Sequence, residues 1–278
     1  MRALLDTVEK LIDRDVPILV LGESGVGKNY LAEAIHACGA RRDQPFVHID
    51  CASIPHELFE SELFGYEKGT FTDAQSRKIG KLEAAKSGTV YFDEIAALTQ
   101  SLQAKLLRAI EEKRFTRLGG HQRVEFAARV ISSTNVDSNA IRRDLFYRIN
   151  VVTLTVPPLR ERREDIPLLL GDRNVDDEAM RILTSYSWPG NVRELRNVIE
   201  RAALFADVIT PAALPDHLRG APSLIEAATR EQWTLDDLEE RYIREVLRMT
   251  KSNYSRAAEI LGINRKTLLE KRKKYGID

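Results

Sequence analysis

The chain has 278 residues, more than one average domain and fewer than three. With 43% hydrophobic and 30% charged residues it can bury a sizeable core, and one long disordered tail is excluded. Its 42 Lys and Arg balance 42 Asp and Glu, which argues against a protein that coats nucleic acid along its whole surface but allows a local basic patch.

Hydropathy and cysteine content indicate the compartment. No apolar run approaches the ~20 residues that a transmembrane helix needs, and residues 1–15 lack the apolar core of a signal peptide. Cys38 and Cys51 have no metal-ligand spacing, so we expect two reduced cysteines rather than a zinc site. These features favour a cytoplasmic protein without a membrane partner.

The first half of the chain alternates between helical patterns and short apolar runs. It opens on an amphipathic helical pattern whose apolar residues share one face: Leu4, Leu5, Val8, Leu11 and Ile12. Another helix is expected over residues 28–38. The runs expected to form buried strands are 17–21, 46–49, 89–92, 129–133 and 151–156. Because such strands alternating with helices form parallel sheets covered on both faces, we predict an α/β subdomain over residues 1–158.

A change of pattern separates the rest of the chain. Three prolines within residues 157–167 interrupt it, and the helical pattern beyond them predicts a helical subdomain over residues 159–218. Residues 219–232 contain glycine and proline without a clean period and are expected to form a linker. Residues 233–278 are helical again and predict a separate all-α domain.

A glycine-rich loop lies between a predicted strand and a predicted helix. Its residues fit the pattern G-x-x-x-x-G-K: Gly22, Glu23, Ser24, Gly25, Val26, Gly27 and Lys28. Glycines let successive N–H groups point at phosphate oxygens, and Lys28 is expected to reach the β- and γ-phosphates of ATP. Asn29 stands where Ser or Thr commonly offers a hydroxyl to Mg²⁺, so its amide oxygen or water is expected there. A glycine-rich turn without a ligand is the alternative.

Two acids support the same site. Asp93 and Glu94 directly follow the apolar run 89–92. Asp93 is expected to hold Mg²⁺ through water, and Glu94 to polarise the water that attacks the phosphoanhydride. Taken alone, the pair reads as a charged strand end, but its place after a phosphate loop favours ATP hydrolysis.

The C-terminal segment is basic, since residues 251–278 hold eight Lys or Arg against three acids. Its pattern predicts two helices that are joined by a tight turn at Gly262. The predicted contacts across the turn join Ala257, Ala258 and Leu261 to Leu268 and Leu269. The second helix is expected in the major groove of double-stranded DNA, with base readers at Arg265, Lys266 and Thr267 and phosphate contacts at Lys271, Arg272, Lys273 and Lys274. A solvated basic hairpin is the alternative.

An apolar helical stripe precedes this hairpin. Its members are Leu235, Leu238, Tyr242, Ile243, Val246 and Leu247. We expect the stripe to help form a dimer, which would place two hairpins on paired DNA half-sites.

Four further motifs resemble those of one known family. They are Glu60–Gly65 (ESELFG), Gln103–Leu107 (QAKLL), Pro157–Arg162 (PPLRER) and Trp188–Leu195 (WPGNVREL). With them, nearly the whole chain resembles the bacterial enhancer-binding proteins, the sigma-54-dependent transcription activators of the AAA+ superfamily. The resemblance implies an AAA+ α/β ATPase subdomain, a helical lid and a Fis-like helix-turn-helix domain. It also implies a homo-oligomeric ring, usually a hexamer, that hydrolyses ATP to remodel sigma-54 RNA polymerase.

The resemblance also implies roles for single residues. Asn135 matches the first sensor of the γ-phosphate, and Arg193 in the lid matches the second. Arg142 and Arg148 match the arginines offered to a neighbouring subunit's ATP, for which a permanently charged guanidinium is suited. The sigma-contacting loop corresponds to residues 69–74, with Phe71 and Thr72 as its matching contacts.

Two positions depart from the family's pattern. Residues 69–74 read Gly-Thr-Phe-Thr-Asp-Ala where the family usually has Gly-Ala-Phe-Thr-Gly-Ala, so Asp73 replaces a flexible glycine and adds negative charge. Asp50 stands where the family commonly has an Asn that holds the catalytic glutamate. An Asp facing Glu94 would repel it or share a proton with it, unless Asp50 faces elsewhere.

Three functions therefore stay open. The first is an enhancer-bound ATPase that activates sigma-54 polymerase. The second, which Asp73 and Asp50 motivate, is a sigma-54-independent DNA-binding regulator in which ATP acts as a ligand or assembly switch. The third is a chaperone-like or protease-associated ATPase ring whose basic tail binds protein. Since the ATPase region begins almost at Met1, either the sequence is a fragment or another protein supplies the control.

Overall fold

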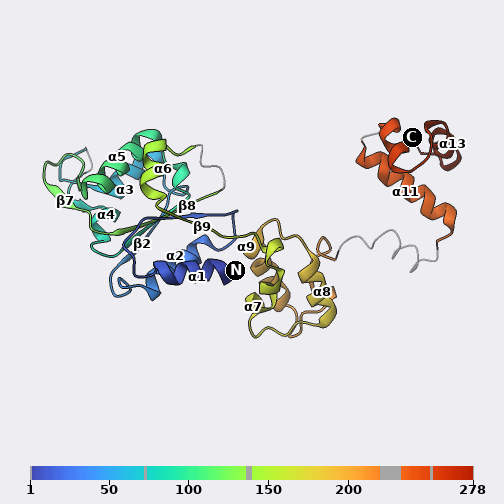
Figure 1. The fold of residues 1–278 in the computed structure, drawn as a ribbon, viewed down its shortest axis with the longest axis horizontal. Coiled ribbons are helices and arrows are strands. Elements are labelled where there is room, and N and C mark those ends of the chain that lie inside the picture. The colour runs from blue at the N-terminus through green and yellow to red at the C-terminus, as the bar shows by residue number, and fades with distance from the viewer. Residues whose placement is uncertain (1, 72–73, 136–139, 220–232, 251–252, 278) are drawn as a thin grey trace. The chain divides into compact units, whose positions relative to one another are not determined.

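The computed structural model describes residues 2–71, 74–135, 140–219, 233–250 and 253–277 (Figure 1). Contacts between residues divide the chain into two compact units, Met1–Ile209 and Thr210–Asp278. Within the described ranges, every helix is too short or too polar to span a lipid bilayer.

A parallel five-stranded sheet forms the centre of the first unit, in the order β2-β5-β8-β1-β9. The strands are β1 (Ile18–Leu21), β2 (Phe46–Asp50), β5 (Thr89–Asp93), β8 (Arg129–Thr134) and β9 (Val152–Thr155). They correspond to the five predicted apolar runs, and the predicted parallel pairing is confirmed. The carboxyl ends of all five strands lie at one edge, where ligands bind in sheets of this kind.

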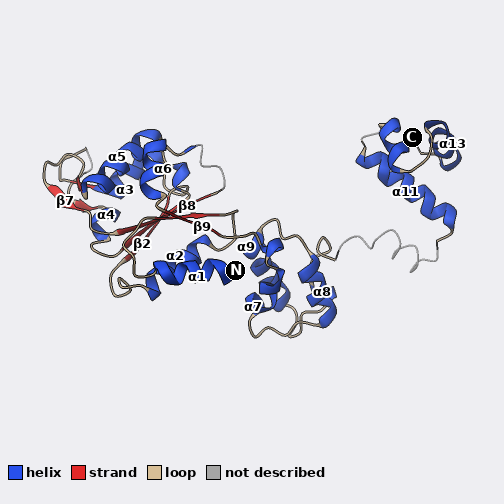
Figure 2. Ribbon diagram, in the orientation of Figure 1, coloured by secondary structure: helices blue, strands red, loops and turns tan. Residues whose placement is uncertain are grey.

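Helices cover both faces of the sheet (Figure 2). One face carries α1 (Arg2–Leu11) and α2 (Lys28–Cys38), which bury Val8, Leu31 and Ile35. The other face carries α3 (His56–Phe64), α4 (Lys81–Ala84), α5 (Gln100–Glu112) and α6 (Arg143–Ile149). Leu5 was predicted on the buried side of α1 but is 46% exposed, because the contact of this helix with the sheet centres on Val8.

A small helical bundle completes the first unit. Its elements are the 3₁₀ turns η3 (Leu159–Glu161) and η4 (Arg163–Asp165) and the helices α7 (Ile166–Leu170), α8 (Asp177–Ser185) and α9 (Asn191–Ala203). Trp188 is fully buried, and its indole N–H donates to the Leu183 carbonyl at 2.7 Å. The predicted helical subdomain is therefore present. Its predicted end at residue 218 stays a prediction, because the contacts group residues 210–218 with the second unit.

Two short antiparallel pairs lie outside the main sheet, and the sequence did not predict them. They are β3 (Gly65–Tyr66) with β4 (Lys78–Ile79), and β6 (Arg114–Thr116) with β7 (Arg123–Glu125). The buried guanidinium of Arg117 joins the two pairs, since it contacts Glu67 at 2.8 Å and Glu83 at 2.7 Å. These ion pairs hold the pKa of Glu83 below its usual range and fix the ends of the segment that carries residues 69–74.

The second unit is built on the helices α11 (Leu235–Met249), α12 (Tyr254–Ile260) and α13 (Arg265–Tyr275). Ala257, Ala258 and Leu268 are buried together, and Gly262 makes the predicted turn with a φ of 66°. Leu269 is 42% exposed, so its predicted contact is wrong: it follows Leu268 by about 100° around the helix and points away from the core.

The predicted apolar stripe of α11 divides between two faces. Ile243, Val246 and Leu247 are buried in the core of the second unit. Leu235 is 85% exposed and Tyr242 is 46% exposed. Only the exposed part of the stripe is therefore available for the expected dimer.

We expect Arg117→Met to lower the free energy of unfolding by about 2 kcal/mol, because Glu67 and Glu83 would lose their buried cation. This is less than the ~3–5 kcal/mol of a fully buried pair, since the two acids are 31% and 20% exposed. Urea unfolding measures the change. The matched control is Arg114→Met, whose exposed pair with Glu112 should contribute less than ~1 kcal/mol. If the two variants lost the same free energy of unfolding, Arg117 would contribute no more than an exposed ion pair.

Candidate functional site

The glycine-rich loop connects β1 to α2 at the carboxyl edge of the sheet. Gly25 and Gly27 have φ values of 77° and 103°, a region that side chains other than hydrogen rarely allow. At Gly25 a Cβ atom would also lie 2.5 Å from the carbonyl oxygen of Gly190, so the bundle and the loop are in close contact there. The predicted strand, loop and helix thus adopt the geometry that exposes backbone N–H groups at a helix start.

Lys28 brings three strand ends together. Its side chain is 5% exposed, and its ammonium donates to the Gly22 carbonyl at 2.9 Å, to Glu94 Oε1 at 3.0 Å and to Asn135 Oδ1 at 3.1 Å. Glu94 follows β5 and Asn135 follows β8, the strand between β5 and β1. The phosphate loop, the catalytic acid and the first sensor named from the sequence therefore share one cluster.

Asp93 lies beside this cluster and is fixed by two hydroxyl groups. Its Oδ1 atom accepts from Ser133 Oγ at 2.5 Å and from the Tyr91 hydroxyl at 3.1 Å. The Tyr91 hydroxyl also lies 2.9 Å from Asn29 Oδ1. The sequence reasoning did not name Tyr91 or Ser133. The signal for Tyr91 was its place two residues before Asp93, which puts both side chains on one face of the strand.

Asp50 is paired in register with Asp93 but turns its carboxylate elsewhere. Its Oδ1 atom accepts the backbone N–H groups of Ala52 at 3.0 Å and Ser53 at 3.2 Å. Glu94 is held by Lys28 and by the backbone N–H of Asn135, at 3.1 Å. Among the described contacts no hydrogen bond joins Asp50 to Glu94, so the reading in which Asp50 faces elsewhere is the one that holds.

The helical bundle is hydrogen-bonded to the glycine-rich loop. Arg193 donates to Ser24 Oγ at 2.9 Å, and the backbone N–H of Val192 donates to the Gly25 carbonyl at 3.0 Å. The buried Asn191 donates to Glu23 Oε2 at 3.1 Å and to the Ser24 carbonyl at 3.0 Å. Arg193, predicted as the second sensor, is thereby placed directly over the loop.

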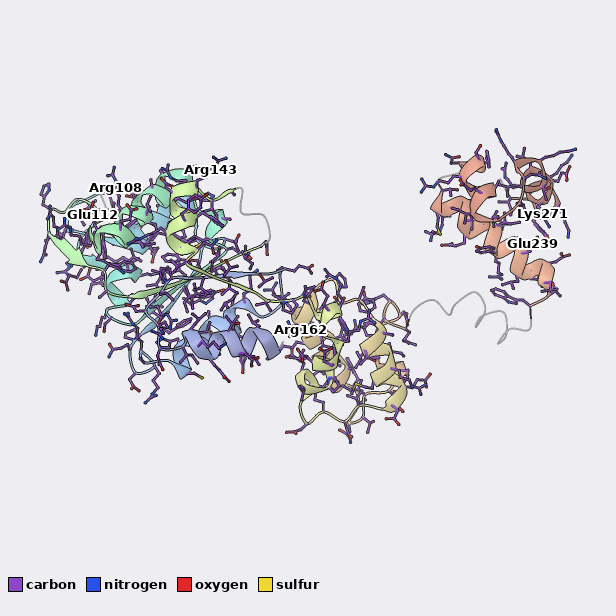
Figure 3. The ribbon with its side chains drawn as sticks, in the orientation of Figure 1. Arg108, Glu112, Arg143, Arg162, Glu239 and Lys271 are labelled. Carbon is purple, nitrogen blue, oxygen red and sulfur yellow. The ribbon has the colours of Figure 1, made fainter. Side chains whose placement is uncertain are left out.

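Two arginines that the sequence reasoning did not assign complete this contact. Arg160 forms a bidentate pair with Glu23 at 2.7 and 2.9 Å. Arg162, which is labelled in Figure 3, donates to the Val26 carbonyl at 2.6 Å. The hydrogen bonds from Arg160 and then from Asn191 lower the pKa of Glu23 to about 2. Both arginines belong to the motif at residues 157–162, which was the available signal.

Of the two arginines expected at a subunit interface, Arg142 is the N-cap residue of α6 and Arg148 lies in its last turn. Arg142 pairs with Asp144 at 2.7 Å, and its backbone N–H donates to the buried Gln103 at 2.7 Å. Arg148 is exposed in the last turn of the helix. Within the part of the chain that the structure describes, no contact joins either one to the Lys28 cluster, so their role stays a prediction.

The expected sigma-contacting loop is described only in part. Phe71 is 45% exposed, and its ring packs edge-on against Tyr66 with 4.7 Å between centroids. Thr70 fixes the base of the loop, because its hydroxyl donates to the Glu67 carbonyl at 2.6 Å. The predicted contact Thr72 and the substituted position Asp73 lie outside the described residues.

The basic helix α13 presents only part of its predicted surface. Arg265 and Lys266 are exposed at its start, whereas Thr267 is half-buried and hydrogen-bonds Asn264. Lys271 pairs with Glu239 of α11 at 2.6 Å (Figure 3). The guanidinium of Arg272 lies 4.6 Å over the Tyr254 ring. The first turn of α13 is thus accessible, while Lys271 and Arg272 contact the neighbouring helices.

Three family models match successive parts of the chain. Residues 1–155 match the Sigma-54 interaction domain, and residues 171–231 match the AAA+ ATPase lid domain. Residues 234–275 match the Bacterial regulatory protein, Fis family.

Individual proteins are similar to this chain over nearly all of its length. The regulatory protein AtoC of Escherichia coli is 43% identical over 94% of this chain and 63% of its own length. The response regulator protein PilR of Pseudomonas aeruginosa is 42% identical over 100% and 68%. The chain thus spans between 63% and 68% of these two relatives. The crystal structure of NtrX from Brucella abortus in complex with ATP aligns with a TM-score of 0.71 at 34% identity, covering 100% of this chain and 68% of that one.

The contact between Glu23 and the bundle predicts a pH dependence. Because its folded-state pKa lies below the unfolded value, Glu23 contributes stability above about pH 4.5, and this is lost as the pH falls towards 2. Solvent screens a pair exposed by 41% and 37%, so we expect less than ~1 kcal/mol. Between pH 6 and pH 3, the midpoint temperature of thermal unfolding should fall less steeply in Glu23→Gln than in the wild type. If the midpoint temperatures of the two proteins fall equally with pH, Glu23 does not contribute this pH-dependent stability.

Proposed function

Because the chain belongs to the sigma-54 interaction domain family of AAA+ transcription regulators, we propose that it hydrolyses ATP to remodel sigma-54 RNA polymerase while bound to DNA. One observation carries the ATPase part of the proposal. The ammonium of Lys28 meets Glu94 and Asn135 at the end of the phosphate loop, so a nucleophile-activating acid and a phosphate-binding cation lie within one hydrogen-bonded cluster.

The residues at this edge can divide the work of hydrolysis. The loop N–H groups and Lys28 bind the phosphates, and Arg193 and Asn135 contact the triphosphate from the bundle and from β8. A bound γ-phosphate would replace Glu94 as the hydrogen-bond partner of Lys28 and Asn135. The Glu94 carboxylate would then be free to orient the attacking water. The acetate-like side chain of Asp93 and the amide oxygen of Asn29 are oxygen donors of the kind that Mg²⁺ prefers, and the ion supplies charge neutralisation when bound.

We assign the interface role to Arg142 and Arg148 in a ring of subunits, usually a hexamer in this family. Arg142 is held in a defined direction by Asp144 and by the hydrogen bond from its N–H to Gln103. A guanidinium fixed outside its own subunit's site suits donation to a neighbour's phosphates. Phe71 and Thr72 remain the proposed contacts with sigma-54.

DNA binding is assigned to the second unit. Arg265 and Lys266 project from the first turn of α13 and are proposed to read base edges, with Thr267 beside them. Lys271 and Arg272 lie further along the helix, where phosphate contacts are expected. On α11 the exposed apolar residues Leu235, Tyr242 and Met249 recur every seven positions, which supports a dimer that presents two such helices to DNA.

The sigma-54-independent alternative has no support in the described residues. It depended on Asp50 facing Glu94, and Asp50 instead accepts backbone N–H groups of its own turn. It depended also on Asp73, which lies outside the described residues. Sigma-54 dependence is tested by reporter transcription in cells that lack sigma-54, where activation by this protein should disappear; unchanged activation would exclude the proposal.

Steady-state ATPase assays test the roles in the nucleotide site. Glu94→Gln should lower kcat by roughly 10²-fold or more while nucleotide binding persists, because the carboxylate acts on water and not on the nucleotide. Lys28→Ala should abolish nucleotide binding. Glu111→Gln, which removes the same charge from the exposed face of α5, is the matched control and should keep full activity. Wild-type turnover in Glu94→Gln would overturn the assignment.

The proposed DNA binding by the second unit is tested by fluorescence anisotropy with a labelled DNA fragment that the protein protects in footprinting. Arg265→Ala should weaken binding to that fragment by about 1–3 kcal/mol and reduce discrimination against unrelated DNA. Arg248→Ala removes the same charge from an exposed site on α11 and serves as the control. If both variants lose the same affinity, Arg265 contributes only net charge and does not read bases.

A further inference from the structure

The hydroxyl of Tyr91 links the two sides of the nucleotide site. Tyr91 is fully buried in the middle of β5, where its ring packs near Phe46 and His48. A buried tyrosine hydroxyl needs a polar partner, and this one lies 2.9 Å from Asn29 Oδ1 and 3.1 Å from Asp93 Oδ1. Asn29 lies in the first turn of α2 and Asp93 ends β5, so one side chain connects the phosphate-loop helix to the acidic strand end.

Counting protons shows that this link is shared. Ser133 Oγ accepts the backbone N–H of Glu94 at 3.2 Å and gives its one proton to Asp93 at 2.5 Å. The Tyr91 hydroxyl also has one proton, and Asn29 Oδ1 and Asp93 Oδ1 are both placed to accept it. It can therefore donate to Asn29 or to Asp93, but not to both at once. When Asn29 gives its oxygen to another partner, the proton of Tyr91 remains with Asp93.

We propose that Tyr91 is a positioning residue for the magnesium side of the site, where its hydroxyl holds the Asn29 amide oxygen and the Asp93 carboxylate in place. The inference rests on the proposed ATP-binding function and adds a residue to it. The oxygens that Tyr91 orients are hard donors suited to Mg²⁺. Groups that orient such donors typically change metal affinity by about 10–100-fold when they are removed.

The substitution Tyr91→Phe separates this role from packing. Phenylalanine keeps the ring that packs between Phe46 and His48 and removes only the hydroxyl. A residue that served the core alone would affect nucleotide binding equally with and without Mg²⁺. A residue that orients Asn29 and Asp93 would affect only the binding that depends on Mg²⁺.

The test is equilibrium binding of a fluorescent, non-hydrolysable ATP analogue to the full chain, with Mg²⁺ titrated from zero. In Tyr91→Phe we expect unchanged affinity in EDTA and a roughly tenfold rise in the Mg²⁺ concentration that gives half of the Mg²⁺-dependent tightening. Asn29→Ala should shift this concentration in the same direction, and the double variant should shift it no further than the larger single change. Tyr66→Phe is the matched control and should behave as the wild type.

An unchanged Mg²⁺ midpoint in Tyr91→Phe, or an equal loss of affinity with and without Mg²⁺, would overturn the inference. If thermal melting shows that Tyr91→Phe is unfolded, the midpoint of Asn29→Ala decides, and a wild-type value there would overturn the inference as well. A wild-type chain that fails to bind the analogue at any Mg²⁺ concentration would instead contradict the proposed ATP-binding function.

Discussion

The structure depends on a buried ammonium group at the carboxyl edge of the sheet. Lys28 is almost fully withdrawn from solvent, and burying an unpaired charge is too costly for a folded protein to tolerate. The Gly22 carbonyl, Glu94 and Asn135 satisfy it, and they come from the phosphate loop and from the ends of β5 and β8. The same contacts that stabilise Lys28 therefore fix the relative positions of three segments distant in sequence. A triphosphate would replace carboxylate and amide as the partner of this charge.

The helical bundle is hydrogen-bonded to the same loop. Arg160, Asn191 and Arg193 all donate to the loop residues Glu23 and Ser24. Gly25 lies so close to Gly190 that a side chain would not fit. The residues of the predicted phosphate loop therefore also form the contact with the bundle.

Much of this arrangement could be predicted from the sequence, because its signals are local. The five strands were visible as apolar runs, and glycines followed by Lys28 identified the loop. Asp93 and Glu94 were recognisable from their place after a strand. The two small hairpins were missed, since their strands have only two or three residues and are held by the distant ion pairs of Arg117. Tyr91 was missed because its apolar neighbours made it read as core, and Leu269 was misplaced because a helical pattern alone does not fix which flank meets the core.

We propose that the loop ending in Lys28 and the acids Asp93 and Glu94 bind one nucleoside triphosphate. A crystal structure with a non-hydrolysable ATP analogue and Mg²⁺ tests it most directly. We expect the triphosphate along residues 22–28, with Lys28 on the γ-phosphate and the Glu94 carboxylate released towards a water molecule. An analogue bound elsewhere, or a Lys28–Glu94 pair that persists with the analogue present, would contradict it.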